Sequence, residues 1–143
     1  MQPVGERENE TTMTSTSTAS ATKFLAAQRK QLLARRESYL ADVARSTATA
    51  LELTEDGANQ DSADEDGFGE GDTLNVERDR LLVVASEAKE RVAEIDAALG
   101  RVEAGTYGRC EACAKPIPEA RLEVVPEATL CVNCKTGASL RRR

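Results

Sequence analysis

Four cysteines, two on either side of a loop, are the residues of this chain with the clearest chemistry. Cys110 and Cys113 form one C-x-x-C pair, Cys131 and Cys134 form a second, and seventeen residues separate the pairs. The chain has no other cysteine and no histidine. Two C-x-x-C turns at this separation place four thiolates around zinc. The spacing therefore predicts one zinc ion bound by Cys110, Cys113, Cys131 and Cys134.

Two disulfides would use the same cysteines and are the main alternative. Disulfides persist in oxidising compartments, whereas the sequence shows no charged-then-apolar leader and no run of about 18 apolar residues. We therefore expect a cytoplasmic protein with reduced cysteines and no membrane association. Four thiolates leave no coordination position for water or substrate, so the predicted zinc is structural. No enzyme is expected, because the chain lacks histidine, a phosphate-binding glycine loop, and a paired nucleophile and base.

The residues around the cysteines predict a small zinc ribbon over residues 105–136. Pro116 and Pro118 favour a turn after the first cysteine pair. The partial alternation from Arg121 to Val125 favours a strand. Because few large apolar side chains lie nearby, zinc binding, worth roughly 10 to 16 kcal/mol in zinc-finger peptides, is expected to supply the folding energy.

The overall charge argues against broad nucleic-acid binding. The net charge of the 143 residues is −6, and aromatic residues make up 3% of the chain, with no tryptophan. Residues 1–76 carry seven basic and fourteen acidic side chains, whereas residues 77–143 carry twelve and eleven. An acidic chain repels phosphate backbones unless it has a local basic patch. Only the terminal Arg141–Arg143 run qualifies, so direct sequence-specific DNA binding is not expected.

The two ends of the chain are predicted to be accessory. Residues 1–22 form a disordered tail, because nine of the twelve residues from Thr11 to Thr22 are serine or threonine and bury little apolar surface. Residues 137–143 form a short basic segment. We expect a short helix from Lys135 to Arg143 that packs near Ala21–Leu25.

A hydrophobic repeat predicts a long helix over residues 23–53. The segment has no glycine or proline, and Arg29 and Arg36 interrupt its second seam position. Leu33 and Leu40 are expected to broaden the apolar face. The first seam position recurs every seven residues at Leu25, Leu32, Tyr39, Ser46 and Leu53.

An acidic turn is predicted over residues 54–72. Gly67, Gly69 and Gly71 disfavour a continuous helix there. Nine acidic residues and no basic one lie between Ser46 and Val76. Such carboxylates could approach a bound divalent metal, contact a basic protein surface, or only keep the chain soluble, which is the commonest role.

A second helix is predicted over residues 73–104, with Gly105 as its C-cap. Its coiled-coil seam consists of Leu81, Ala85, Ala88, Val92, Ile95, Leu99 and Val102. Two long helices with matching stripes fold back on each other. The predicted fold is thus mainly α: a disordered N-terminal tail, an antiparallel two-helix coiled-coil hairpin over residues 23–104, and a C-terminal four-cysteine zinc ribbon.

The cysteine region resembles the zinc finger of the DksA/TraR family of bacterial transcription factors. The resemblance is carried by Gly105-Thr-Tyr-Gly-Arg-Cys-Glu-Ala-Cys-Ala-Lys-Pro-Ile-Pro, Arg121-Leu-Glu and Leu130-Cys-Val-Asn-Cys-Lys. Glu94-Ile-Asp-Ala-Ala-Leu also fits the family's preceding helix. The match is specific over about residues 77–136. Ala114 stands where many relatives have glycine.

The resemblance implies a monomer that binds RNA polymerase and regulates initiation. In the family, the coiled coil enters the secondary channel and its tip approaches the active-site magnesium. The stretch nearest to the family's Asp-x-x-Asp-x-Ala tip motif is Asp61-Ser-Ala-Asp64-Glu-Asp66, which has Asp66 where the family has alanine and differs in the surrounding glycines. Carboxylate oxygens suit magnesium, and the resemblance assigns these three residues to the partner-binding tip.

Two other functions use the same cysteine region. A nucleic-acid-binding zinc ribbon would contact phosphates through Arg109, Lys115, Arg121 and Lys135, although these side chains could instead offset the thiolate charge. A thiol redox switch would release zinc when its cysteines are oxidised.

Overall fold

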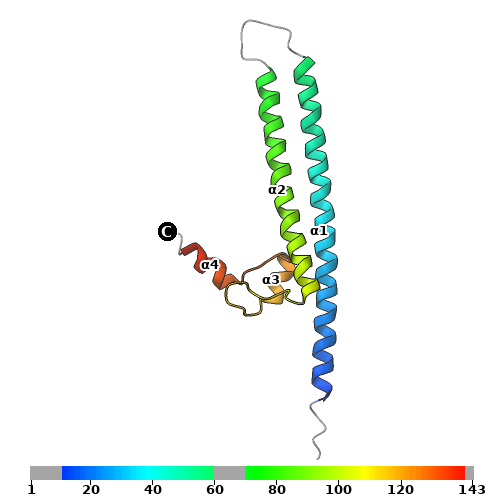
Figure 1. The fold of residues 1–143 in the computed structure, drawn as a ribbon, viewed down its shortest axis with the longest axis vertical. Helices are drawn as coiled ribbons and strands as arrows, with labels where there is room; N and C mark the ends of the chain where they lie inside the picture. The colour runs from blue at the N-terminus through cyan, green and yellow to red at the C-terminus, as the bar shows by residue number, and fades with distance from the viewer. Residues whose placement is uncertain (1–10, 60–69, 141–143) are drawn as a thin grey trace, which may run out of the picture.

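Two long antiparallel helices dominate the structure, a computed structural model that describes residues 11–59 and 70–140. Helices α1 (Thr11–Asn59) and α2 (Glu70–Ala104) lie side by side (Figure 1). Helices α3 (Glu119–Val124) and α4 (Val132–Leu140) belong to the cysteine-containing segment near the base of this pair. The described residues therefore form the predicted mainly helical hairpin with a C-terminal four-cysteine segment.

Helix α1 begins earlier than the sequence predicted. Thr11–Thr22 continues the helix, although we expected residues 1–22 to be disordered. No glycine or proline interrupts the helix in this segment. The hydroxyl of Thr22 is accommodated within the helix, because it donates to the carbonyl oxygen of Thr18 at 2.9 Å. Figure 1 shows this first part of α1 extending beyond the level of the cysteine segment.

Both helices also extend further towards the turn than predicted. Helix α1 continues past residue 53 to Asn59, and α2 begins at Glu70 rather than at residue 73. The hydroxyl of Thr54, just beyond the predicted end, donates to the carbonyl oxygen of Ala50 at 2.9 Å, a bond that threonine can form within a helix. Residues 60–69, and with them Asp61, Asp64 and Asp66, lie outside the described residues.

The interface between the helices is thin and rich in alanine. Leu32, Ile95 and Ala98 form its best-buried cluster, and Tyr39 and Leu99 pack against them. The other buried apolar seam residues are Ala50, Ala85 and Ala88. Small side chains allow two helices to approach closely, so the α2 heptad seam predicted from the sequence is the face that contacts α1.

One of the two charged residues at the second seam position of α1, Arg36, has a structural role. Arg36 reaches across the hairpin and donates to the carboxylate of Asp96 at 2.6 Å. Leu33 and Leu40 do not broaden the buried face, because they remain 41% and 42% exposed. The prediction for these two leucines was wrong, because the interface is only one alanine-rich stripe wide.

Gly105 ends helix α2 as predicted. It has a positive φ of 74°, which a residue without a Cβ adopts without steric cost. The N–H of Thr106 donates to the carbonyl oxygen of Arg101 at 3.0 Å, and the N–H of Gly105 reaches that of Val102 at 3.4 Å. These two bonds form a Schellman motif that turns the chain away from the hairpin.

The cysteine segment has little β-structure. Residues 119–124 form the short helix α3 rather than the predicted strand. Pro118 precedes the helix and its carbonyl oxygen accepts bonds from the N–H groups of Arg121 and Leu122, while the side chain of Leu122 is buried. Among the described residues, pairing is limited to one bridge between Arg109 and Pro116. Burial of Leu122 thus overrides the weak local strand preference.

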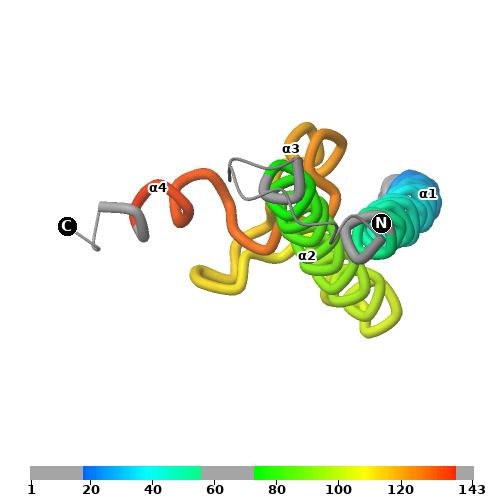
Figure 2. The backbone as a smooth tube through the Cα atoms, turned by 90° about the horizontal axis from the view of Figure 1, so that it is seen from above, coloured from blue at the N-terminus to red at the C-terminus, as the bar shows by residue number. Residues whose placement is uncertain are grey.

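Helix α4 does not pack near Ala21–Leu25 as we expected. Both views show it leading away from the hairpin, on the side of α2 opposite to α1 (Figures 1 and 2). The first turn of α4 carries Cys134, whose sulfur atom lies beside those of the other three cysteines. The start of the helix is therefore held at the cysteine cluster. Arg141–Arg143 lie outside the described residues.

Candidate metal centre

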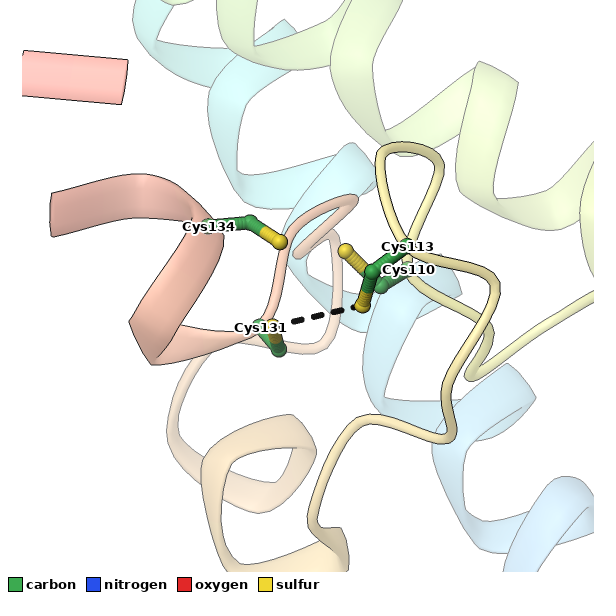
Figure 3. A group of neighbouring side chains, drawn as sticks. All are labelled: Cys110, Cys113, Cys131 and Cys134. Atoms are coloured by element: carbon green, nitrogen blue, oxygen red, sulfur yellow. Dashed lines mark hydrogen bonds between the residues drawn. The ribbon is translucent and has the colours of Figure 1, made fainter. Parts of the chain in front are cut away.

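Two short backbone turns present the four cysteines. In the first turn, the N–H of Cys110 donates to the carbonyl oxygen of Lys115, and the N–H of Ala114 donates to that of Cys110, both at 2.9 Å. In the second, Cys131 directly precedes α4 and its carbonyl oxygen accepts from the N–H of Lys135 at 3.0 Å. Figure 3 shows the side chains from both turns converging on one point.

The spacing of the sulfur atoms fits a tetrahedral metal site. The four Sγ atoms lie within 4.8 Å of one another, and those of Cys113 and Cys131 are 3.8 Å apart. Four zinc–sulfur bonds of about 2.3 Å in tetrahedral geometry separate the sulfur atoms by about 3.8 Å. All four cysteines are free thiols, which excludes the two-disulfide alternative in this structure.

Without a cation, the four thiols compete for protons. Backbone N–H groups, that of Cys131 above all and also those of Cys113 and Ala112, lower the pKa of the Cys110 thiol to about 6 although burial opposes them. Hydrogen bonds to the other sulfur atoms, first that of Cys131, raise the pKa of Cys134 to about 12. A divalent cation removes this conflict because it deprotonates the thiols that coordinate it.

The first cysteine turn contains a strained residue. Ala114 has a positive φ of 59°, a conformation that favours glycine and costs a residue with a Cβ roughly 1 to 2 kcal/mol. Nearby Gly108 also has a positive φ, of 80°, and a Cβ there would lie 3.4 Å from Cδ1 of Leu122. The backbone around Cys110 is therefore shaped by two left-handed residues, only one of which is glycine.

A small apolar core links the metal centre to the hairpin. Cys110, Ile117 and Leu122 are buried together, and Phe24 of α1 packs against them. The same core includes Tyr107, which also packs on the Leu32 cluster of the hairpin. The cysteine segment and the base of the hairpin therefore share one continuous set of apolar contacts.

Polar side chains of α1 hold the loop that follows α3. Gln31 donates to the carbonyl oxygen of Glu123 at 3.0 Å. Arg35 donates to the carbonyl oxygen of Val124 at 3.0 Å and pairs with the carboxylate of Glu127 at 3.4 Å. Sequence reasoning missed these positioning residues. The arginines that interrupt the α1 repeat are Arg29 and Arg36, so that interruption did not point to Gln31 or Arg35.

A groove of about 450 Å³ lies between α2 and the cysteine segment. The three arginines among its four basic lining residues are already engaged. Arg91 bonds to Glu94 at 2.9 Å, Arg101 reaches the carbonyl oxygen of Glu127 at 3.4 Å, and Arg121 donates to that of Leu130 at 3.1 Å. Arg121 thus has a structural role within the cysteine segment.

Comparison with known proteins finds a family model for the cysteine segment and relatives over about half of the chain. Residues 105–139 match the family model described as the prokaryotic dksA/traR C4-type zinc finger. The "RNA polymerase-binding transcription factor DksA" of Caulobacter vibrioides NA1000 is 40% identical over 74 residues, covering 50% of this chain and 52% of the relative. The protein of the same name from Escherichia coli K12 is 35% identical over 74 residues, covering 50% and 49%.

The fold is similar over a longer stretch. The structure of transcription factor DksA2 from Pseudomonas aeruginosa matches with a TM-score of 0.71 and 26% identity, covering 85% of this chain and 87% of that one. By sequence, the chain spans about half the length of the curated relatives it matches.

The fold and the site define a helical hairpin protein with a C4 zinc finger, in which four clustered thiols imply one structural zinc ion. Its finger is similar to the DksA/TraR C4-type zinc finger, and its hairpin and finger together are similar in fold to DksA2. None of the described helices combines the length and the apolar character that a membrane span requires.

Proposed function

We propose that this protein binds RNA polymerase and regulates transcription initiation, and that it is not an enzyme. The observation that carries the proposal is the match of hairpin and finger together to DksA2 over 85% of the chain at a TM-score of 0.71. The relatives named RNA polymerase-binding transcription factor DksA support the same partner. We place the protein in the cytoplasm, where this partner acts, as a monomer.

The proposed mechanism uses the hairpin as an arm and the zinc finger as its base. The hairpin enters the secondary channel of the polymerase, and the acidic turn forms the working end. Cys110, Cys113, Cys131 and Cys134 are the proposed zinc ligands. Their ion replaces a large hydrophobic core, because the finger buries few large apolar side chains.

Direct binding to purified core RNA polymerase tests the proposal. The zinc-loaded chain should form a complex on size-exclusion chromatography and change the yield of initiating transcripts from a panel of promoters. Failure to bind core enzyme would overturn the proposed function. Salt-dependent retention on DNA in the absence of polymerase would instead favour the nucleic-acid-binding alternative.

The tip is tested separately by charge neutralisation. The Asp61→Asn/Asp64→Asn double variant should fold and bind zinc normally but lose its effect on transcription, because carboxylate oxygens at the working end are proposed to act near magnesium. The Glu87→Gln/Glu90→Gln double variant removes two exposed carboxylates from α2 and serves as the matched control. Normal regulation by the tip variant would show that the carboxylates of Asp61 and Asp64 are not needed at the working end.

A further inference from the structure

Helix α1 has one side that no other part of the described chain covers. Leu32 and Tyr39 face α2, whereas Phe24 packs on the zinc finger. In Figure 2, α1 lies at the edge of the molecule, with α2 between it and α4, so one side of α1 faces away from both. We call this side the outer α1 face. Its six side chains are all exposed: Ala26, Arg29, Lys30, Leu33, Glu37 and Leu40.

The charged residues of the outer α1 face lie on either side of Leu33. Glu37 follows Leu33 by four residues, whereas Arg29 precedes it by four and Lys30 by three. At the helical rise of about 1.5 Å per residue, the anion lies about 6 Å from Leu33 in one direction and the two cations about 4.5 to 6 Å in the other. The face therefore has a positive end and a negative end, with a leucine between them.

These three charges have no partner within the described part of the chain. Arg29, Lys30 and Glu37 form no ion pair and no side-chain hydrogen bond there. The neighbouring Arg35 and Arg36 differ, because each is paired with a carboxylate of another element. A face with one unpaired end of each sign is complementary to itself when two copies meet in opposite directions.

The apolar residues of the outer α1 face have the same symmetry about Leu33. Ala26 and Leu40 lie seven residues before and after it, so the three residues form one line of about 21 Å along the helix. In an antiparallel pair, Leu33 meets Leu33 of the second copy, and Leu40 lies level with Ala26 of the second copy. A large side chain thus faces a small one at each end of the line, which lets the two helices approach closely.

We propose that the outer α1 face binds the same face of a second copy of this chain, as an antiparallel pair with its twofold axis beside Leu33. Arg29 and Lys30 of each copy then lie level with Glu37 of the other, so opposite charges meet on both sides of the axis. A parallel pair is disfavoured, because it would place each charge beside the same charge of the second copy. The proposal concerns the free chain and does not rest on the proposed function, in which a single copy acts on the polymerase.

The contact is small, so the pair should be weak and should dissociate on dilution. Each copy contributes Leu33 and Leu40, which are 41% and 42% exposed, whereas stable interfaces bury about 1,200 to 2,000 Å². We expect a dissociation constant on the order of 100 µM. Sedimentation equilibrium of the zinc-loaded full-length chain, from roughly 10 µM to roughly 1 mM, measures it. A monomer throughout this range would overturn the proposal.

Complementary charge reversals test the pairing of the two copies. Glu37→Lys leaves only cations on the face, and Arg29→Glu/Lys30→Glu leaves only anions. Each variant alone should self-associate at least about tenfold more weakly than the unmodified chain, because like charges then meet on both sides of the axis. Mixed in equal amounts, the two variants should associate with each other, since opposite charges meet again at every level. Failure of the mixture to associate would overturn the proposal.

The matched controls reverse exposed charges on α2. Glu87→Lys and Lys89→Glu make the same kinds of change on a helix that the proposed contact does not include. Both should leave self-association unchanged. Equal weakening by these variants and by the reversals on α1 would show that net charge, and not the outer α1 face, controls association.

The apolar line is tested by Leu33→Gln/Leu40→Gln, which should weaken self-association at least about tenfold. Zinc content and helix content should not change, because both side chains are partly solvated. Unchanged self-association of this variant would exclude the outer α1 face as the contact.

A photo-cross-linking residue at position 40 tests the direction of the pair. Its adduct with a second copy should map near residue 26. An adduct near residue 40 would show a parallel pair, and an adduct outside α1 would show a different contact, so either result would overturn the proposal. The proposed function is tested independently, because a chain that stays monomeric but binds polymerase would contradict only the antiparallel pair.

Discussion

The hydroxyl of Tyr107 donates a 2.8 Å hydrogen bond to the carbonyl oxygen of Pro126, a residue that is itself fully buried. The same hydroxyl lies 3.2 Å from Oε1 of the buried Gln28. Tyr107 follows α2, Pro126 follows α3, and Gln28 belongs to α1. One phenol group therefore joins the turn into the zinc finger, the loop within it and the first helix of the hairpin.

Tyr107→Phe should lower the free energy of unfolding by about 2 kcal/mol, because it leaves the buried carbonyl of Pro126 without its donor and removes the polar neighbour of the buried Gln28 amide. Urea titration followed by far-UV circular dichroism in zinc-containing buffer measures the change. Tyr39→Phe is the matched control, since Tyr39 packs on the Leu32 cluster without a comparable hydrogen bond among the described residues. Equal losses in the two variants would show that the Tyr107 hydroxyl contributes nothing specific.

The ionisation of Tyr107 gives a prediction about pH. Burial raises the pKa of Tyr107 from 10.0 to about 12. The guanidinium group of Arg101 opposes this shift, and the carboxylate of Glu127 adds to it. The folded protein thus holds this proton more tightly than the unfolded chain does. The resulting stabilisation is fully present below pH 10 and is lost as the pH rises through about 12.

The Tyr39→Phe variant isolates this titration, because the chain has two tyrosines and no tryptophan. Phenolate absorbance should rise with a midpoint near pH 12 in the folded protein and near pH 10 in concentrated urea. A folded-state midpoint near 10 would mean that the phenol is solvated and that its contact with Pro126 does not persist in solution.

The positive φ of Ala114 predicts that a substitution can stabilise the finger. Ala114→Gly should raise the free energy of unfolding by about 1 kcal/mol, because glycine adopts this conformation without a Cβ clash. Gly105→Ala should have the opposite effect at the end of α2, where nothing lies within 4 Å of the added Cβ and only the φ of 74° opposes it. Thermal melts of the zinc-loaded variants compare the two. Destabilisation by Ala114→Gly would contradict the strain argument.

The hairpin could be predicted from the sequence because the pattern of apolar residues that specifies it is local and periodic. The α2 seam from Leu81 to Val102 repeats every three or four residues, and each seam residue is buried or half-buried in the structure. Gly105 is equally local, since a glycine after a helical repeat commonly ends the helix. The four cysteines could be recognised as a zinc site because metal ligands follow strict spacing rules.

The remaining features depend on contacts between distant parts of the chain. The sequence around Leu122 favours a strand only weakly, and its burial against Phe24 and Ile117 selects the helix α3. Leu33 looked like a core residue because only the packed hairpin shows how narrow its interface is. Arg35 is paired with Glu127, ninety-two positions away, and no local pattern specifies such a pair.

Removal of zinc should unfold the finger and leave much of the hairpin helical. The finger buries few large side chains and depends on the metal, whereas α1 and α2 pack along their own seam. With a chelator present, hydrogen exchange should become fast over residues 110–134 and slower loss of protection should follow around Phe24, which packs on the finger. Cys113→Ser should reproduce this pattern without chelator. Stoichiometric zinc in that variant would contradict the four-cysteine site.

Arg35 is expected to orient the finger without contributing to zinc binding. Its guanidinium group joins α1 to the Val124 carbonyl and to the Glu127 carboxylate, whose side chain is only 12% exposed. Arg35→Gln should therefore speed hydrogen exchange in α3 and the loop after it, while zinc content stays stoichiometric. Arg45→Gln is the control, because among the described residues the Arg45 side chain forms only an exposed ion pair with Asp42 within α1, and such pairs contribute about 0 to 1 kcal/mol. Equal exchange in α3 for both variants would show that apolar packing alone orients the finger. Loss of zinc from Arg35→Gln would show instead that the contact is needed for folding of the metal site itself.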